Sequence, residues 1–125
     1  MALIVQKYGG TSVGTVDRIQ AVAEKVAGFH KRGDQVVVVV SAMSGETNRL
    51  IELAKGVSDN PSPREMDVLV STGEQVTIAL LSMALQKQGI NARSYTGSQI
   101  PLRTDSVHSK ACLLYTSDAA DEEDS

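Results

Sequence analysis

A lysine, a glycine pair and two hydroxyl side chains stand together near the start of the chain, in the run Lys7-Tyr8-Gly9-Gly10-Thr11-Ser12. Glycines let backbone N–H groups approach an oxyanion, hydroxyls add donors, and lysine supplies a full positive charge. A helix starting just after them would add partial positive charge. These residues suit nucleotide phosphates and favour phosphoryl transfer, although their order matches neither a Walker A loop nor the dinucleotide fingerprint. A glycine turn that merely begins a helix is the alternative.

Two further stretches place polar side chains where a substrate could be held. Ser41 and Thr47 follow a valine-rich run and could hydrogen-bond a ligand, but Ser44 or Thr47 could equally cap a helix. Glu74 stands at the junction of two expected helices, where its carboxylate could accept hydrogen bonds from a substrate ammonium group. A carboxylate at a helix N-terminus is also favourable without any ligand. Both interpretations stay open on local grounds.

Short apolar strands must position the first two stretches. Residues 2–6 and the valine run 35–40 read as buried parallel strands. Between them Val16, Ile19 and Ala23 recur at helical spacing, which predicts an amphipathic helix. Because ligands bind outside the carboxyl ends of the strands in open parallel sheets, we expect the loops after both strands to lie close together.

The remaining pattern continues as helices and short strands. Apolar residues from Leu50 to Val57 predict a second helix, and Pro63 suits the first turn of a third. We expect two helices end to end over residues 65–88, broken at Gly73, followed by a strand over 92–95 and another short one over 99–102. The fold class is α/β.

Composition narrows the classes of function. The chain has 125 residues, a net charge of −3, 42% hydrophobic residues and a single cysteine. No cluster of Lys and Arg appears, so we expect no nucleic-acid partner. No apolar run approaches the roughly 20 residues that cross a bilayer, so we expect no membrane partner and a cytoplasmic location. His30 and His108 lack metal-ligand spacing, so no metal is assigned to the protein itself.

Three stretches together resemble the bacterial aspartate kinases in order and spacing. They are residues 6–12 (Gln-Lys-Tyr-Gly-Gly-Thr-Ser), 41–48 (Ser-Ala-Met-Ser-Gly-Glu-Thr-Asn) and 71–74 (Ser-Thr-Gly-Glu). Residues 95–99 and 103–105 extend the resemblance to about Ala111. It implies the amino-acid kinase fold, an open and mainly parallel sheet sandwiched between helices. It also implies transfer of the γ-phosphate of ATP to the β-carboxylate of L-aspartate, the first step toward lysine, threonine and methionine.

The resemblance assigns a set of nucleotide-binding residues. Lys7 would be the catalytic residue that neutralises charge on the transferring phosphate, with Mg²⁺ accompanying the ATP. Gly9 and Gly10 would present N–H groups to the phosphates, while Tyr8 and Ser41 would line the same site. Complete family members would assemble as homo- or hetero-oligomers.

Thr47 and Glu74 would hold L-aspartate by the same resemblance. The acceptor carboxylate is already ionised at neutral pH, so no general base is required. Positioning and charge stabilisation would then carry the catalysis. Two alternatives stay open: another kinase of the same fold, such as acetylglutamate kinase, or a non-catalytic ligand-binding fragment.

The resemblance ends near Ala111. Residues 1–111 are expected to form the N-terminal part of the catalytic domain, incomplete and inactive alone, because the later Gly-Arg-Gly-Gly-Ser-Asp stretch of the family does not follow. From Cys112 onward there are five acids and no base, and residues 112–125 match nothing expected of the family. We interpret them as a disordered acidic tail foreign to the gene, such as translated adapter sequence.

Overall fold

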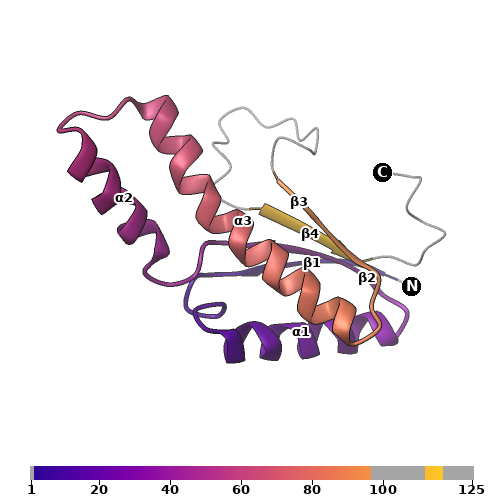
Figure 1. The fold of residues 1–125 in the computed structure, drawn as a ribbon. Helices are drawn as coiled ribbons and strands as arrows, with labels where there is room; N and C mark the ends of the chain where they lie inside the picture. Colours follow the sequence, from indigo (N-terminus) through magenta and orange to yellow (C-terminus); the bar gives the residue numbers. More distant parts are fainter. Residues whose placement is uncertain (1, 97–111, 117–125) are drawn as a thin grey trace.

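The computed structural model describes residues 2–96 and the backbone of residues 112–116, and these residues form an α/β unit (Figure 1). The elements follow in the order β1 (Leu3–Tyr8), α1 (Val16–Lys31), β2 (Gln35–Val40), α2 (Glu46–Val57), α3 (Pro63–Lys87), β3 (Ala92–Tyr95) and β4 (Cys112–Thr116). The predicted strands at 35–40 and 92–95 are confirmed, and β1 runs two residues beyond the predicted end. The expectation that the first strand is buried is wrong, because its residues alternate between exposed and half-buried on a sheet with one open face. The strand predicted at 99–102 lies outside the described residues.

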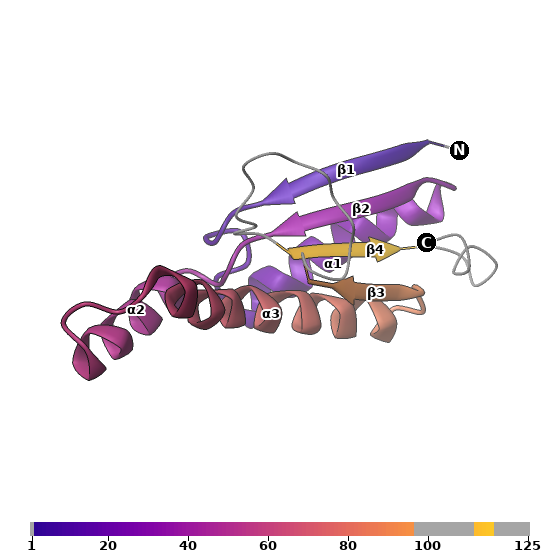
Figure 2. The same cartoon turned by 90° about the horizontal axis from the view of Figure 1, so that it is seen from above.

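The four strands form one sheet in the order β1-β2-β4-β3. β1 and β2 are parallel, with Lys7 opposite Val39 and Tyr8 opposite Val40. β4 is antiparallel to both of its neighbours, so β1, β2 and β3 share one direction and β4 opposes them (Figure 2). The sheet is therefore an incomplete α/β sheet with three strands in the predicted common direction.

Strand β4 differs from the expectation of a disordered tail. Its residues, Cys112–Thr116, hydrogen-bond between β2 and β3, with Val38 opposite Leu114. The expected disorder is therefore wrong for these five residues. The physical reason is long-range pairing with β2 and β3, which the acidic composition further along the sequence does not reveal, while Tyr115 and Thr116 are of types that favour strands. That residues 112–125 are foreign to the gene stays a prediction.

One face of the sheet is covered by α1 and α3, and the core lies between the strands and these two helices. Val36, Val38 and Val40 alternate inward along β2 and are fully buried. The core cluster adds α1 residues, including Val26, and α3 residues, including Leu81. The amphipathic helix predicted in this region is confirmed, although Val16 at its start is 60% exposed.

The other face of the sheet carries no helix among the described residues. Leu3 is 63% and Val5 is 66% exposed there, and both share this face with Lys7 because alternate residues of a strand point the same way. Figure 2 looks onto this face, with α1 behind the strands. A second helical layer, as the predicted sandwich requires, would have to come from elsewhere.

Helix α3 runs without a break from Pro63 to Lys87, so the predicted interruption at Gly73 is wrong. Ser62 caps its first turn, with its Oγ accepting a hydrogen bond from the Glu65 N–H at 3.3 Å, and Pro63 opens the helix as predicted. Gly89 follows the last turn with φ +83°.

By length and composition α3 is apolar enough to cross a membrane, with a mean hydropathy of 1.5 over its most apolar window. The expectation that no segment has this character is therefore wrong for α3. A core helix passes the same test, and α3 packs against α1, α2, β3 and β4. That packing accounts for the buried apolar residues of α3, such as Ile78 and Leu81, whereas Val68, Val76 and Met83 are exposed.

Candidate functional site

The glycine-rich segment after β1 forms a compact loop rather than leading directly into a helix. The Ser12 N–H donates to the Gly9 carbonyl at 3.1 Å, and the loop continues to Thr15, which caps α1. The Thr15 hydroxyl accepts from the Arg18 N–H at 3.2 Å. The Thr15 cap satisfies one N–H of the first turn of α1, and Gly14 just before it packs on the loop, since a Cβ there would stand 3.2 Å from the Gly10 carbonyl oxygen. The contribution of this helix end to a phosphate cradle stays a prediction.

The loop after β2 packs directly on the glycine-rich loop, as predicted. The Ser41 N–H donates to the Tyr8 carbonyl at 3.3 Å, and the Ser44 N–H donates to the Gly10 carbonyl at 3.2 Å. A Cβ at Gly10 would stand 3.0 Å from the Ala42 carbonyl oxygen, so only glycine fits this approach without a shift. The two loops that carry the predicted nucleotide-binding residues Gly10 and Ser41 are therefore joined by backbone contacts.

Thr47 lies in the first turn of α2, and it does not cap the helix. The N-cap residue is Gly45, with φ +87° and no side-chain cap. The alternative in which Ser44 or Thr47 serves only as a cap is therefore wrong. Thr47 is half-buried beside the Ser41–Gly45 loop. Next to it, Glu46 and Arg49 form a bidentate ion pair at 2.9 and 3.0 Å.

Glu74 is buried in the middle of α3, with 4% of its surface exposed. The alternative that explained it as a carboxylate at a helix N-terminus is therefore wrong. The neighbouring hydroxyls of Ser71 and Thr72 are occupied within the helix, donating to the Val68 and Leu69 carbonyls at 2.8 and 2.6 Å. A buried carboxylate is unusual outside a binding or ion-pair role.

Helix α3 meets both α2 and the Ser41–Gly45 loop at Gly73, the residue before Glu74. A Cβ at Gly73 would stand 3.0 Å from the Ala42 Cβ and 3.4 Å from the Leu50 Cδ1. Contacts therefore run from the glycine-rich loop to Ala42 and on to Gly73. This packing brings the three sequence stretches together. The contribution of Ala42 and Gly73 was not predicted, although a glycine inside a helical pattern could have signalled a close approach.

Lys7 lies on the open face of the sheet, away from α1 and α3, because it alternates with Tyr8 along β1. It is exposed and is the next-to-last residue of its strand. Tyr8 points to the covered side and packs on the core, while its hydroxyl donates to the Gln6 Oε1 at 2.8 Å. The structure therefore places Lys7 and Tyr8 on opposite faces of the sheet edge.

A shallow hollow of about 400 Å³ lies beside Tyr8 and Ser12. Arg18 and Lys25 of α1 contribute to its wall, and the Lys25 Nζ stands 5.8 Å from the centre of the Tyr8 ring. Burial raises the pKa of the Tyr8 hydroxyl above its ordinary value. The two cations were missed by the sequence analysis, although a spacing of seven residues places them on one face of α1.

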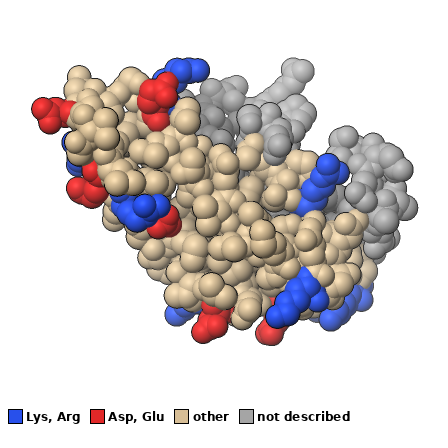
Figure 3. All heavy atoms as spheres, viewed as in Figure 1, with Lys and Arg blue, Asp and Glu red and all other residues tan. Residues whose placement is uncertain are grey.

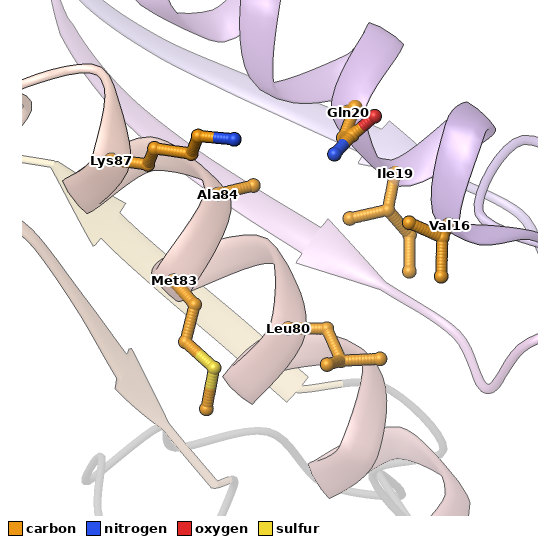
Figure 4. Close-up of a pocket in the computed structure, with 7 residues that line it drawn as sticks. All are labelled: Val16, Ile19, Gln20, Leu80, Met83, Ala84 and Lys87. Atoms are coloured by element: carbon orange, nitrogen blue, oxygen red, sulfur yellow. The ribbon is translucent and has the colours of Figure 1, made fainter.

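A second hollow, a groove of about 210 Å³, lies between α1 and α3 (Figure 4). Its walls are mainly aliphatic, with Gln20 and Lys87 at one end, and none of the predicted site residues lines it. The lining residues are Val16, Ile19, Gln20, Leu80, Met83, Ala84 and Lys87. The groove is therefore separate from the place where the three stretches meet.

Charge on the helical face is mixed rather than concentrated. Acidic and basic side chains are interspersed over α2 and around the rim, while the middle of the face over α3 is mostly uncharged (Figure 3). The hydrogen bond and charge of Arg49 hold the pKa of Glu46 below its ordinary value. Among the described residues, no group of three or more His, Cys, Asp or Glu side chains is placed to hold a metal ion.

Comparison with known proteins gives a consistent picture. Residues 2–121 match the model of the amino acid kinase family. Over 114 residues the chain is 70% identical to an aspartate kinase (Ask_LysC) of Stutzerimonas stutzeri (strain A1501), covering 91% of this chain and 28% of the relative. It is 69% identical to an aspartokinase of Pseudomonas aeruginosa over 118 residues, 94% of this chain and 29% of that protein. Aspartokinase 2 of Bacillus subtilis (strain 168) is 56% identical over 124 residues, covering 98% of this chain and 30% of the relative.

Solved structures show the same likeness. A crystal structure of aspartate kinase from Synechocystis superposes with a TM-score of 0.75 at 59% identity, over 78% of this chain and 17% of that one. Aspartokinase III of E. coli matches with a TM-score of 0.55 at 23% identity, over 70% of this chain and 30% of that one, and supports the fold alone. The chain spans about three-tenths of the length of the aspartate kinases of Stutzerimonas stutzeri, Pseudomonas aeruginosa and Bacillus subtilis. Because the model of the amino acid kinase family matches residues 2–121, which is most of the chain, the chain belongs to this family.

Proposed function

We propose that this chain is the N-terminal part of an aspartate kinase, which transfers the γ-phosphate of ATP to the β-carboxylate of L-aspartate. The substrate assignment rests on the identity of up to 70% with proteins named as aspartate kinases. The contacts that join the three polar stretches support it, because a kinase must hold its nucleotide and its acceptor side by side. The product would be 4-phospho-L-aspartate, at the start of lysine, threonine and methionine synthesis.

The glycine-rich loop is the proposed binding site for the nucleotide phosphates. Gly9 and Gly10 would present N–H groups, and Ser41 would add a donor at the adjoining edge. Gly9 is exposed, and in the part of the chain that the structure describes no other residue lies within 4 Å of the point that a Cβ would occupy there, so a ligand has room to approach it. Lys7 is exposed at the end of β1, and its charge would stabilise the transferring phosphate from the open face of the sheet.

Thr47 and Glu74 are the proposed residues that hold aspartate. Glu74 would accept hydrogen bonds from the substrate ammonium group, and its burial would strengthen them by excluding water. Thr47 would add a hydroxyl from the first turn of α2. Positioning and charge stabilisation would carry the reaction, because the attacking carboxylate needs no deprotonation at neutral pH.

Mg²⁺ is proposed to accompany the nucleotide, where it would neutralise charge on the phosphates. Magnesium in such sites is commonly held through substrate phosphates with only one or two carboxylates. Cytoplasmic location and oligomeric assembly of the complete protein are further parts of the proposal. They follow from the resemblance to the aspartate kinases.

The test uses a complete enzyme, because the chain spans only 29% of the Pseudomonas aeruginosa aspartokinase. In the hybrid enzyme, residues 2–96 of this chain replace their aligned counterparts in that aspartokinase. We expect the hybrid to phosphorylate L-aspartate and not N-acetylglutamate, measured as ATP-dependent formation of acyl phosphate trapped by hydroxylamine. Preference for N-acetylglutamate, or no phosphorylation of either by a folded hybrid, would contradict the proposal.

A further inference from the structure

Gly73 stands in the interior of α3, where glycine is an unfavourable residue. Glycine in a helix interior is destabilising by about 1 kcal/mol relative to alanine. The helix nevertheless continues through it without a break, from Pro63 to Lys87. Gly73 therefore neither ends nor kinks the helix, and its presence needs a packing explanation.

The space beside Gly73 is filled by two neighbouring segments. A Cβ there would stand 3.0 Å from the Ala42 Cβ, 3.4 Å from the Leu50 Cδ1 and 3.8 Å from the Glu46 Cβ. Ala42 and Leu50 are themselves buried, at 6% and 5% exposure. Figure 1 shows the same arrangement, with α2 and the chain entering it beside the first half of α3. The missing side chain is what lets α3 come this close.

These contacts join the segments that carry the two proposed aspartate-binding residues. Gly73 directly precedes Glu74 on α3, while Glu46 and Leu50 flank Thr47 on α2. The distance between α3 and α2 at this point therefore sets where Thr47 and Glu74 stand relative to each other. The buried Thr77 hydroxyl, which donates to the Gly73 carbonyl at 3.2 Å, fixes the same turn of α3 from inside.

We propose that Gly73 is a positioning residue for the aspartate site, setting the spacing between Glu74 and Thr47 through its contact with Ala42 and α2. The proposal rests on the proposed function of those two residues. A methyl group at Gly73 would stand 3.0 Å from the Ala42 Cβ, closer than nearly all such contacts, so α3 and the Ala42 segment must move apart by a few tenths of an ångström. Because a misplacement of about 1 Å can cost a hundredfold, we expect a shift of this smaller size to cost up to about tenfold.

The test replaces Gly73 in the hybrid enzyme and then restores the lost space. We expect Gly73→Ala to raise the KM for aspartate about tenfold while the KM for ATP changes less than about threefold. Adding Ala42→Gly removes the methyl that the new side chain meets, so the double variant should recover most of the aspartate affinity. Gly28→Ala on α1 is the matched control, because no other described residue lies within 4 Å of a Cβ there, and it should leave both KM values unchanged.

Thermal unfolding of the same variants gives a readout that does not depend on activity. Without a steric conflict, alanine in a helix interior raises the melting temperature, as expected for Gly28→Ala. Gly73→Ala should lower it, and Ala42→Gly should restore it in the double variant. A stabilised Gly73→Ala protein, an unchanged KM for aspartate in an active hybrid, or failure of Ala42→Gly to rescue would overturn the proposal. If the hybrid has no activity on aspartate, the proposed function fails, and the melting temperatures still decide the packing claim.

Discussion

Replacement of Gly10 by alanine tests whether the two loops at the sheet edge form one rigid unit. The new Cβ would stand 3.0 Å from the Ala42 carbonyl oxygen and 3.5 Å from the Ser44 nitrogen, and both are backbone atoms that cannot rotate away. The loops would have to separate, which stretches the hydrogen bond that the Ser44 N–H donates to the Gly10 carbonyl beyond its present N···O distance of 3.2 Å. That length is already at the long end of the ordinary range.

The magnitude follows from three contributions. Loss of one hydrogen bond costs about 0.5–1.5 kcal/mol, and forcing an extra methyl into a packed contact costs about 1–3 kcal/mol. Reduced freedom of the unfolded chain returns about 0.4–1 kcal/mol for a glycine-to-alanine change. We therefore expect Gly10→Ala to destabilise the hybrid enzyme by about 2 kcal/mol and to raise the KM for ATP more than that for aspartate.

Gly9→Ala is the matched control for stability in this loop. Among the described residues nothing lies within 4 Å of a Cβ at Gly9, and its φ is not positive, so the substitution should leave the free energy of unfolding unchanged or raise it slightly. Because Gly9 is itself a proposed phosphate contact, it is no control for the KM for ATP. Urea unfolding followed by circular dichroism, with steady-state kinetics in parallel, measures both variants. Equal unfolding midpoints for Gly9→Ala and Gly10→Ala, or an unchanged KM for ATP in Gly10→Ala, would refute the reasoning.

Three further predictions concern the site and the open sheet. Glu74→Gln keeps the shape of the side chain but removes its charge, and a hydrogen bond to a charged group is worth about 1.5–3 kcal/mol. The KM for aspartate should therefore rise about 10- to 100-fold while the KM for ATP changes little. Equal changes in both KM values would argue against the assignment. Burial should raise the pKa of the Tyr8 hydroxyl above its ordinary value of 10.0, so its contribution to stability is present below that pH and is lost as the pH rises through the raised pKa. Absorbance titration of the hybrid enzyme, compared with its Tyr8→Phe variant, measures this pKa, and an ordinary value would contradict the prediction. The isolated 125-residue chain should self-associate through the exposed Leu3 and Val5. Val5→Lys should reduce that association in sedimentation experiments. A cooperative thermal transition from a soluble monomer would contradict this expectation.

Most of the described helices and strands could be predicted from the sequence, because the hydrophobic patterns and turn residues that mark them are local. The valine run predicted β2 with its observed bounds, Gln35–Val40, and Pro63 marked the start of α3. Alternating burial along β2 follows from a strand whose two faces meet different neighbours. The convergence of the loops after β1 and β2 was also predictable, since it depends only on parallel strand direction.

The errors arose where tertiary packing overrode a local preference. Gly73 was interpreted as a helix break from its propensity, whereas contact with Ala42 and Leu50 gives the glycine a different reason. Glu74 was placed near a helix end for the same reason. The start of the tail was judged from the acids beyond it, while the pairing of Cys112–Thr116 with β2 and β3 is a long-range contact that composition does not reveal.

A structure of the hybrid enzyme bound to L-aspartate and an unreactive ATP analogue would show whether the three stretches form one binding site. We expect both ligands where the stretches meet, with the aspartate ammonium within hydrogen-bond distance of the Glu74 carboxylate, about 2.7–3.2 Å. The terminal phosphate should lie against the Gly9 and Gly10 N–H groups and near the Lys7 ammonium. Aspartate bound away from Glu74, or phosphates bound away from the glycine-rich loop, would contradict it.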